Sequence, residues 1–198
     1  MANITGSMVK ELREMTGAGI VDCKDALKEC EGDIEKAKDH LRKKGIAKAD
    51  KKASRSTDQG AVGSYIHAGG TVGVLIEVSC ETDFVAKNEA FQTLVRDVAM
   101  HIAAMNPLCV SSDQVPEDVI EKEREIARDK ALNEGKKEEF LDKIIDGRIQ
   151  KFYTEACLLN QKFVKDDSKT IEQIVTEAVA TIGENIQVKR FVRYEVGA

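Results

Sequence analysis

The side chains that most often carry enzyme chemistry are few in this chain and are scattered along it. The three histidines, His40, His67 and His101, lie far apart in the sequence: we expect His40 at the surface and His101 as a hydrogen-bonded histidine of the core. The sequence contains neither a G-x-x-x-x-G-K-[ST] nucleotide motif nor a G-x-S-x-G nucleophile motif. The many carboxylates stand beside lysine and arginine and suggest no acid–base pair. These observations favour a binding protein over an enzyme, with no catalytic residue.

Five cysteines could bind a metal or form disulfides, but their spacing favours neither. The count is odd, and no two form a C-x-x-C pair. Each lies in an apolar context, where a free cysteine behaves as a small hydrophobic residue. We therefore expect free thiols in a reducing, cytoplasmic setting, with no metal site and no cofactor. The five are Cys23, Cys30, Cys80, Cys109 and Cys157.

One short segment, Thr82-Asp83-Phe84-Val85, stands out because it connects a predicted strand to a predicted helix. Connections run over the surface and often carry function. Phe84 has two interpretations: its ring folds back into its own core, as most phenylalanines do, or it is an apolar anchor for a partner. Burying such a ring in a partner contributes roughly 1.5–3 kcal/mol. Thr82 and Asp83 could orient the ring by hydrogen-bonding backbone groups, but the residues alone leave both interpretations open.

Residues 1–45 are predicted to form a module of three short helices. Thr5 can cap the first helix, Gly32 ends the second, Asp33 can cap the third, and Gly45 ends it. Three helices of this length bury little surface, and so small a module usually binds something. Their expected apolar stripes are Met8, Leu12 and Met15; Ile20, Cys23, Leu27 and Cys30; and Ile34, Ala37 and Leu41.

Residues 46–60 are predicted to be a basic linker. Between positions 42 and 55 the positive side chains face only Asp50. Such a run is either a solvated, extended tether or a surface that touches RNA or a phosphate. The net charge of −5 argues against a dedicated nucleic-acid binder. The basic residues are Arg42, Lys43, Lys44, Lys48, Lys51, Lys52 and Arg55.

Residues 61–198 predict an α+β core with a small antiparallel sheet. Strict alternation of apolar residues over 72–78 is the period of a half-buried strand, and 62–66 supply its hairpin partner across a turn at 68–71. A final strand is expected at 186–196. Three strands leave two open edges, a liability that dimerisation can resolve.

Helices are expected to pack with this sheet. Asn88 can cap one that ends before Asn106-Pro107, and 116–157 predict an antiparallel helical hairpin that starts at Pro116. Residues 158–169 show no clear period, and a further helix follows from Thr170. The expected apolar stripes are Phe91, Leu94, Val95, Val98 and Ile102; Phe140, Ile144, Ile149, Phe152 and Ala156; and Ile171, Ile174, Val175, Ala178 and Ile182.

Two long stretches resemble the signatures of the bacterial elongation factor Ts family. The first runs from Leu12 to Leu27, LREMTGAGIVDCKDAL, and the second from Cys80 to Asn88, CETDFVAKN. Shorter resemblances occur at 63–67 (GSYIH), 100–103 (MHIA) and 190–197 (RFVRYEVG). The similarity covers essentially the whole chain, and the length resembles the family's short form, in which the core is not duplicated.

The resemblance implies a guanine nucleotide-exchange factor of translation elongation that binds elongation factor Tu carrying GDP. In the family, the phenylalanine that matches Phe84 inserts into the GTPase domain near the helix that follows the magnesium-binding switch. The segment Thr82–Val85, with Asp83 as the ring's neighbour, is linked to dislodging magnesium, which promotes GDP release so that GTP can bind. His67 matches a histidine near this wedge.

The resemblance also assigns the N-terminal module. It implies a ubiquitin-associated-like fold that docks on another helix of the GTPase domain, with Lys10, Arg13, Ile20 and Val21 at contact positions. The short form is generally dimeric, which agrees with the argument from open sheet edges. No direct nucleotide binding and no required nucleic acid are expected. No membrane is expected either, since the chain has no membrane-length apolar run and no secretory signal.

Two other functions compete with nucleotide exchange. A binding adaptor would use the helical module on a dimeric scaffold to recruit another helix or peptide, without accelerating any reaction. An RNA-associated translation protein would use the basic run, and its affinity would fall steeply with salt.

Overall fold

The computed structural model describes residues 4–198, which form two units built from interleaved parts of the chain. The first unit joins Met1–Ala61, Val78–Leu94 and Gln173–Gln187, and the second joins Val62–Glu77, Val95–Glu172 and Val188–Ala198. Several helices and strands therefore contribute to both. The combination of helices with a small sheet confirms the α+β class, whereas the predicted domain boundaries at 45 and 60 stay a prediction.

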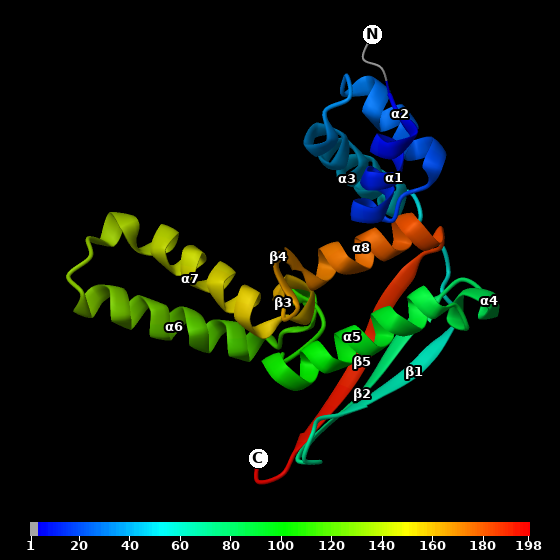
Figure 1. Cartoon of the computed structure of the whole chain (residues 1–198). Helices are drawn as coiled ribbons and strands as arrows, with labels where there is room; N and C mark the ends of the chain where they lie inside the picture. The colour runs from blue at the N-terminus through cyan, green and yellow to red at the C-terminus, as the bar shows by residue number, and fades with distance from the viewer. Residues whose placement is uncertain (1–3) are drawn as a thin grey trace. The chain divides into compact units, whose positions relative to one another are not determined.

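Three helices open the first unit (Figure 1): α1 Gly6–Thr16, α2 Ile20–Glu29 and α3 Ile34–Asp50. Both predicted caps are confirmed. The Thr5 hydroxyl accepts a hydrogen bond from the backbone N–H of Met8, and the Asp33 carboxylate accepts one from that of Lys36 at 3.0 Å. Each side chain satisfies an N–H group that has no partner inside its helix.

The core of these three helices is small and apolar, as predicted for a module that buries little surface. It consists of Leu12, Cys23, Ala26, Leu27, Ala37 and Leu41. The predicted stripes are wrong at two positions, because Met15 and Ile20 are exposed. Both lie next to the α1–α2 connection, where a helical period no longer determines which side faces inward.

The predicted end of the third helix is wrong. α3 continues through Gly45 to Asp50, so residues 46–50 are helical rather than an extended tether. A glycine inside a helix costs only about 1 kcal/mol relative to alanine, and here a Cβ on Gly45 would lie 3.3 Å from the Cβ of Ala180. A close approach of two helices thus explains the glycine better than a helix end does.

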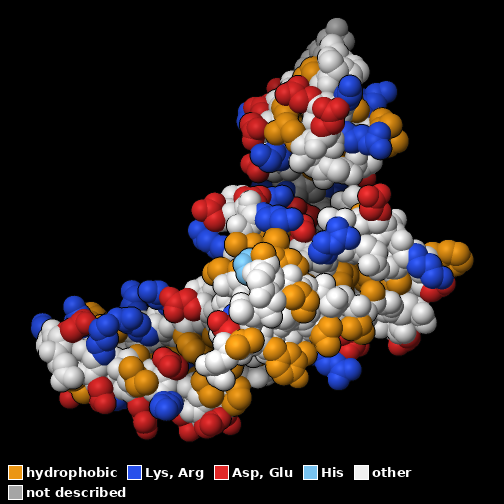
Figure 2. Space-filling model, turned by 60° about the horizontal axis from the view of Figure 1, so that its bottom comes forward, with side chains coloured by type: hydrophobic (Ala, Val, Ile, Leu, Met, Phe, Trp, Pro, Cys, Tyr) orange, Lys and Arg blue, Asp and Glu red, His pale blue; other side chains and the backbone are white. Residues whose placement is uncertain are grey.

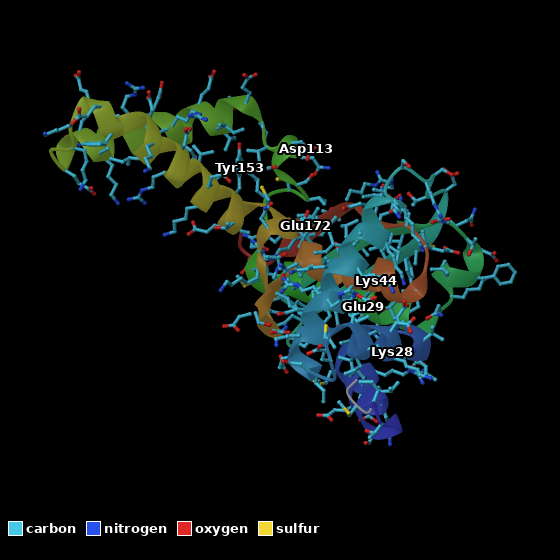
Figure 3. The ribbon with its side chains drawn as sticks, turned by 90° about the horizontal axis from the view of Figure 1, so that it is seen from above. Lys28, Glu29, Lys44, Asp113, Tyr153 and Glu172 are labelled. Atoms are coloured by element: carbon cyan, nitrogen blue, oxygen red, sulfur yellow. The ribbon has the colours of Figure 1, made fainter. Side chains whose placement is uncertain are left out.

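Part of the basic run has partners within the first unit. The ammonium groups of Lys44 and Lys48 each lie 2.9 Å from a carboxylate oxygen of Asp22, and the Lys52 ammonium donates to the backbone carbonyl of Gly183. The two lysines lower the pKa of Asp22. Figure 3 labels Lys44 on α3, together with Glu29 on α2. These three lysines therefore make contacts within the folded unit, in addition to being in water.

A three-stranded sheet has the order β1–β2–β5, with β1 Gln59–Ile66, β2 Val72–Cys80 and β5 Ile186–Glu195. The predicted hairpin and final strand are confirmed. The N–H of Val196 donates to the carbonyl of Thr71, and the Ser79 hydroxyl donates to the carbonyl of Gln187. The start of β2 therefore meets the end of β5, so these strands are antiparallel.

The inner face of the sheet packs under α5, Glu89–Met105, which Asn88 caps as predicted by accepting from the N–H of Ala90 at 2.8 Å. A Cβ on Gly63 of β1 would lie 2.3 Å from a methyl carbon of Val95, so only glycine allows this close packing. The buried residues of β2 and α5 include the predicted Val74, Ile76, Val78, Phe91, Leu94, Val95, Val98 and Ile102, which confirms both predicted stripes.

The helical hairpin of the second unit consists of α6 Glu117–Asn133 and α7 Leu141–Ala156 (Figure 1). The predicted stripe of α7 is partly wrong: Leu141 and Ile145 are buried together with Ile149, whereas Phe140 is exposed. The outer surface is dense in acidic and basic side chains (Figure 2). One pair, Arg124 and Asp146, joins the two helices at 3.1 Å.

Residues 158–169, which show no period in the sequence, form a small hairpin of β3 Lys162–Phe163 and β4 Asp166–Thr170. α8, Ile171–Ile182, follows at once. A strand of two residues is too short to show alternation, which explains why it was missed. Three short 3₁₀ turns complete the elements: Ser112–Gln114, Glu138–Phe140 and Leu158–Asn160.

His101 is a buried, hydrogen-bonded core histidine, as predicted. Its Nε2 donates to the Gln161 side-chain oxygen at 2.9 Å, and its Nδ1 accepts from the N–H of Val164 at 3.2 Å. Burial lowers the pKa of the imidazole, and the acceptor role of Nδ1 requires the neutral ring. The five cysteines are free thiols.

Candidate functional site

The segment Thr82–Val85 lies at a single helical turn, α4, Asp83–Ala86. The Thr82 hydroxyl caps this turn by accepting from the N–H of Val85 at 3.4 Å, and the Thr82 carbonyl accepts from that of Ala86. The sequence predicted a connection here, since four residues are too few for an apolar period. The turn rather than an extended loop therefore determines the direction of the side chains.

Phe84 points into solvent, with 81% of its surface exposed. Within the turn the inward contact is made by Ala86, which is buried. Of the two interpretations of Phe84, the structure excludes the one in which the ring packs in its own core.

The Asp83 side chain pairs with a lysine four positions further along the chain. Its carboxylate accepts a hydrogen bond from the Lys87 ammonium at 2.7 Å, and this bond lowers the pKa of Asp83. Both side chains are largely exposed, so solvent screens this ion pair and it adds little to the stability of the fold. Asp83 thus bridges the ends of α4.

Glu184 is a residue of this site that the sequence did not indicate. One carboxylate oxygen accepts from the backbone N–H groups of Glu81 and Thr82 at 3.1 and 3.0 Å, and the other accepts from the Thr82 hydroxyl at 2.7 Å. In the sequence Glu184 is simply part of the turn Gly183-Glu184-Asn185. No local pattern identifies a contact between residues 102 positions apart.

A second carboxylate, that of Glu81, makes the reciprocal contact with the segment that contains Glu184. Glu81 accepts from the backbone N–H of Asn185 at 2.7 Å, and it lies 3.4 Å from the Arg55 guanidinium. The hydrogen bond from Asn185, followed by the charge of Arg55, lowers the pKa of Glu81. The buried Asn185 amide donates to the carbonyls of Arg55 and Ala53. The residues before α4, those after α8 and those before β1 therefore meet at one cluster.

The four predicted contact residues of the N-terminal module are all exposed and lie on α1 and α2. Val21 is 72% exposed, and its neighbour Ile20 is also open to solvent in the first turn of α2. Lys10 and Arg13 lie on α1, where Lys10 is within 3.7 Å of Glu14. The two apolar side chains thus form a surface with no core role. Its role in binding stays a prediction, as does the ubiquitin-associated-like fold.

His67 belongs to the second unit and follows β1 directly in the hairpin turn. Its Nδ1 lies 3.2 Å from the hydroxyl of Tyr65, and the ring is exposed. The structure therefore gives Tyr65 as the local partner of His67, while a place near the wedge stays a prediction.

Residues 4–198 contain no group of three or more histidine, cysteine, aspartate or glutamate side chains that could hold a metal ion. Nor does any helix among them have the length and apolar character needed to cross a membrane.

Comparison with known proteins identifies the family. The family model described as elongation factor TS matches residues 46–198. A protein named elongation factor Ts from Desulforamulus reducens is 58% identical over 197 residues, covering 100% of this chain and 91% of the relative. Another of that name from Oleidesulfovibrio alaskensis is 54% identical over 198 residues and covers 100% of both chains. The chain belongs to the elongation factor Ts family.

Proposed function

We propose that the protein is a guanine nucleotide-exchange factor that acts on elongation factor Tu carrying GDP. Membership of the elongation factor Ts family supports a role in translation elongation. The observation that carries the proposal is the exposure of Phe84, a large apolar ring presented on a short turn between β2 and α5. Exposure of such a ring to water is unfavourable, and its burial by a partner lowers the free energy of the complex.

Exchange requires no covalent chemistry in this chain. If the factor binds the GTPase better without GDP than with it, thermodynamic linkage makes the factor weaken GDP binding by the same ratio. Insertion of Phe84, with Thr82, Asp83 and Val85 around it, dislodges magnesium in this proposal. The phosphates of GDP then lose the charge that neutralised them, and GDP leaves faster. The protein is therefore no enzyme and binds no nucleotide itself.

The N-terminal module provides a second contact in this proposal. Ile20 and Val21 dock on the GTPase by apolar burial, and Lys10 and Arg13 add charge at the edge of that surface. The contact raises affinity without touching the nucleotide site. The module and the α4 turn then hold the GTPase at two points, and His67 lies near the wedge.

A homodimer is the further assembly that we propose, and the outer face of the sheet supports it. Ile66 and Leu75 are exposed there although both are large and apolar. With Tyr194 and Val196 they line a hollow of about 440 Å³. β1 is also an edge strand, so a second copy would cover both an apolar face and open backbone groups.

The experiment that tests the function measures release of fluorescent GDP from elongation factor Tu. The proposal expects acceleration by substoichiometric amounts of this protein, since each molecule acts repeatedly. A binding adaptor would form a complex without changing the release rate, and that result would refute exchange. An RNA-associated protein would instead bind RNA with an affinity that falls steeply as salt rises.

A further inference from the structure

The direction of Phe84 cannot come from contacts of its own ring, because the ring is almost wholly in solvent. It must come from the backbone of α4, which is one turn of four residues. An isolated turn of helix is unstable, since nucleation orders several residues for a single hydrogen bond. Side chains from elsewhere in the first unit must therefore hold this turn.

Glu184 makes the contacts that can do so. It accepts three hydrogen bonds from two consecutive residues, Glu81 and Thr82, at 2.7–3.1 Å. Thr82 in turn caps α4 through its hydroxyl and accepts from Ala86 through its carbonyl. The position of Thr82 therefore determines the position of the α4 turn that carries Phe84.

Glu184 is itself held in place from the other side. Its neighbour Asn185 is buried and donates its backbone N–H to Glu81 at 2.7 Å and its amide to Arg55 and Ala53 carbonyls. Each of the two chain segments therefore offers a carboxylate to backbone N–H groups of the other. A reciprocal pair of this kind fixes both position and orientation, which a single ion pair does not.

We propose that Glu184 is a positioning residue for nucleotide exchange, which holds the Thr82–Val85 turn so that Phe84 is presented in its binding direction before the GTPase arrives. This inference rests on the proposed exchange function. A pre-organised ring loses less conformational entropy when it inserts. Without Glu184 the turn samples other conformations, and only a fraction of encounters presents the ring correctly.

The direct test replaces Glu184 by alanine in the full chain and measures release of fluorescent GDP from elongation factor Tu. Because Thr82 is exposed, water can replace the lost carboxylate, so Glu184→Ala is expected to fold with an unchanged circular dichroism spectrum. Removing charge-assisted hydrogen bonds is expected to lower the catalysed rate about tenfold. Glu125→Ala, at an exposed glutamate of α6, is the matched control and is expected to keep the full rate.

A double-mutant cycle separates positioning from a general structural role. If Glu184 acts through the ring, Glu184→Ala lowers the rate in the parent protein but by less than about twofold in a Phe84→Ala background. A second, independent tenfold loss in that background would overturn the proposal. Glu184→Gln keeps a carbonyl oxygen for the two N–H groups and can donate to the Thr82 hydroxyl, so it is expected to retain most of the rate. Equal losses in the glutamine and alanine variants would also overturn it.

The outcomes distinguish this inference from the proposed function. If the parent protein does not accelerate GDP release, or Phe84→Ala retains the full rate, the function or its wedge fails whatever Glu184 does. If Phe84→Ala loses activity while Glu184→Ala keeps it, the function stands and the positioning role alone is refuted.

Discussion

Replacing Phe84 by alanine is expected to remove function without disturbing folding. The ring is 81% exposed and belongs to no core cluster. Its loss removes no packing in the free protein, and alanine is the better helix former for α4. We expect the free energy of unfolding to change by less than about 0.5 kcal/mol.

The effect on exchange follows from burying the same ring in the GTPase. Full burial of a phenylalanine contributes roughly 1.5–3 kcal/mol. If that free energy is gained only when the factor displaces GDP, its loss lowers the catalysed rate roughly 10- to 150-fold, at tenfold for each 1.36 kcal/mol. A ring that is only half buried in the complex would give the lower end of this range.

The assay follows fluorescent GDP leaving elongation factor Tu as the concentration of the factor is raised. Phe140→Ala is the matched control, because Phe140 is also exposed, at 52%, but lies in the helical hairpin outside both proposed contacts. We expect its rate to equal that of the parent protein. Thermal unfolding of both variants verifies that neither change acts through stability.

Two results would refute the reasoning. A Phe84→Ala variant that releases GDP at the parent rate would show that the ring is not the wedge. A variant that unfolds several degrees earlier would show that Phe84 stabilises the fold, contrary to its exposure.

The remaining predictions concern the module, the core and the dimer. Val21→Asp places a charge on the exposed start of α2 and is expected to raise the concentration of factor needed for half-maximal GDP release about tenfold or more, with the maximal rate unchanged; a fall in the maximal rate alone would contradict a docking role. For His101, burial lowers the folded-state pKa below the ordinary value of about 6.5, so the unfolded chain binds a proton that the folded chain does not. The free energy of unfolding is therefore highest above about pH 6.5 and falls with decreasing pH by up to about 1.4 kcal/mol per unit from this group. Urea unfolding at several pH values measures this slope, and the His101→Gln variant is expected to lose it. Ile66→Lys, at a position that is 66% exposed on the sheet, is expected to yield a monomer by analytical ultracentrifugation, while Ile126→Lys on α6 keeps the dimer; a dimeric Ile66→Lys would refute the proposed interface.

Features that depend on neighbours in sequence were predicted well. Thr5, Asp33 and Asn88 cap the helices expected of them, because an N-cap bond joins residues two or three positions apart. The alternation over 72–78 identified the central strand, since side chains of a strand alternate between its faces.

Features that depend on packing between distant segments were predicted less well. Gly45 looked like a helix end, but its use is the close approach to Ala180. On α7 the predicted stripe contained Ile144, whereas the structure buries the neighbouring Ile145, because the facing helix decides which of the two lies in the core. The β3–β4 hairpin is defined by its pairing, which a strand of two residues cannot reveal by itself.

The Thr82–Val85 turn shows the same division within the candidate site. The sequence alone determined that a phenylalanine stands in a strand-to-helix connection, and its resemblance to a family named the partner. Only the tertiary structure decided that the ring faces solvent and that Glu184 holds the turn. The reason is physical: exposure depends on everything that packs around a residue, and the carboxylate that meets Thr82 comes from 102 positions away.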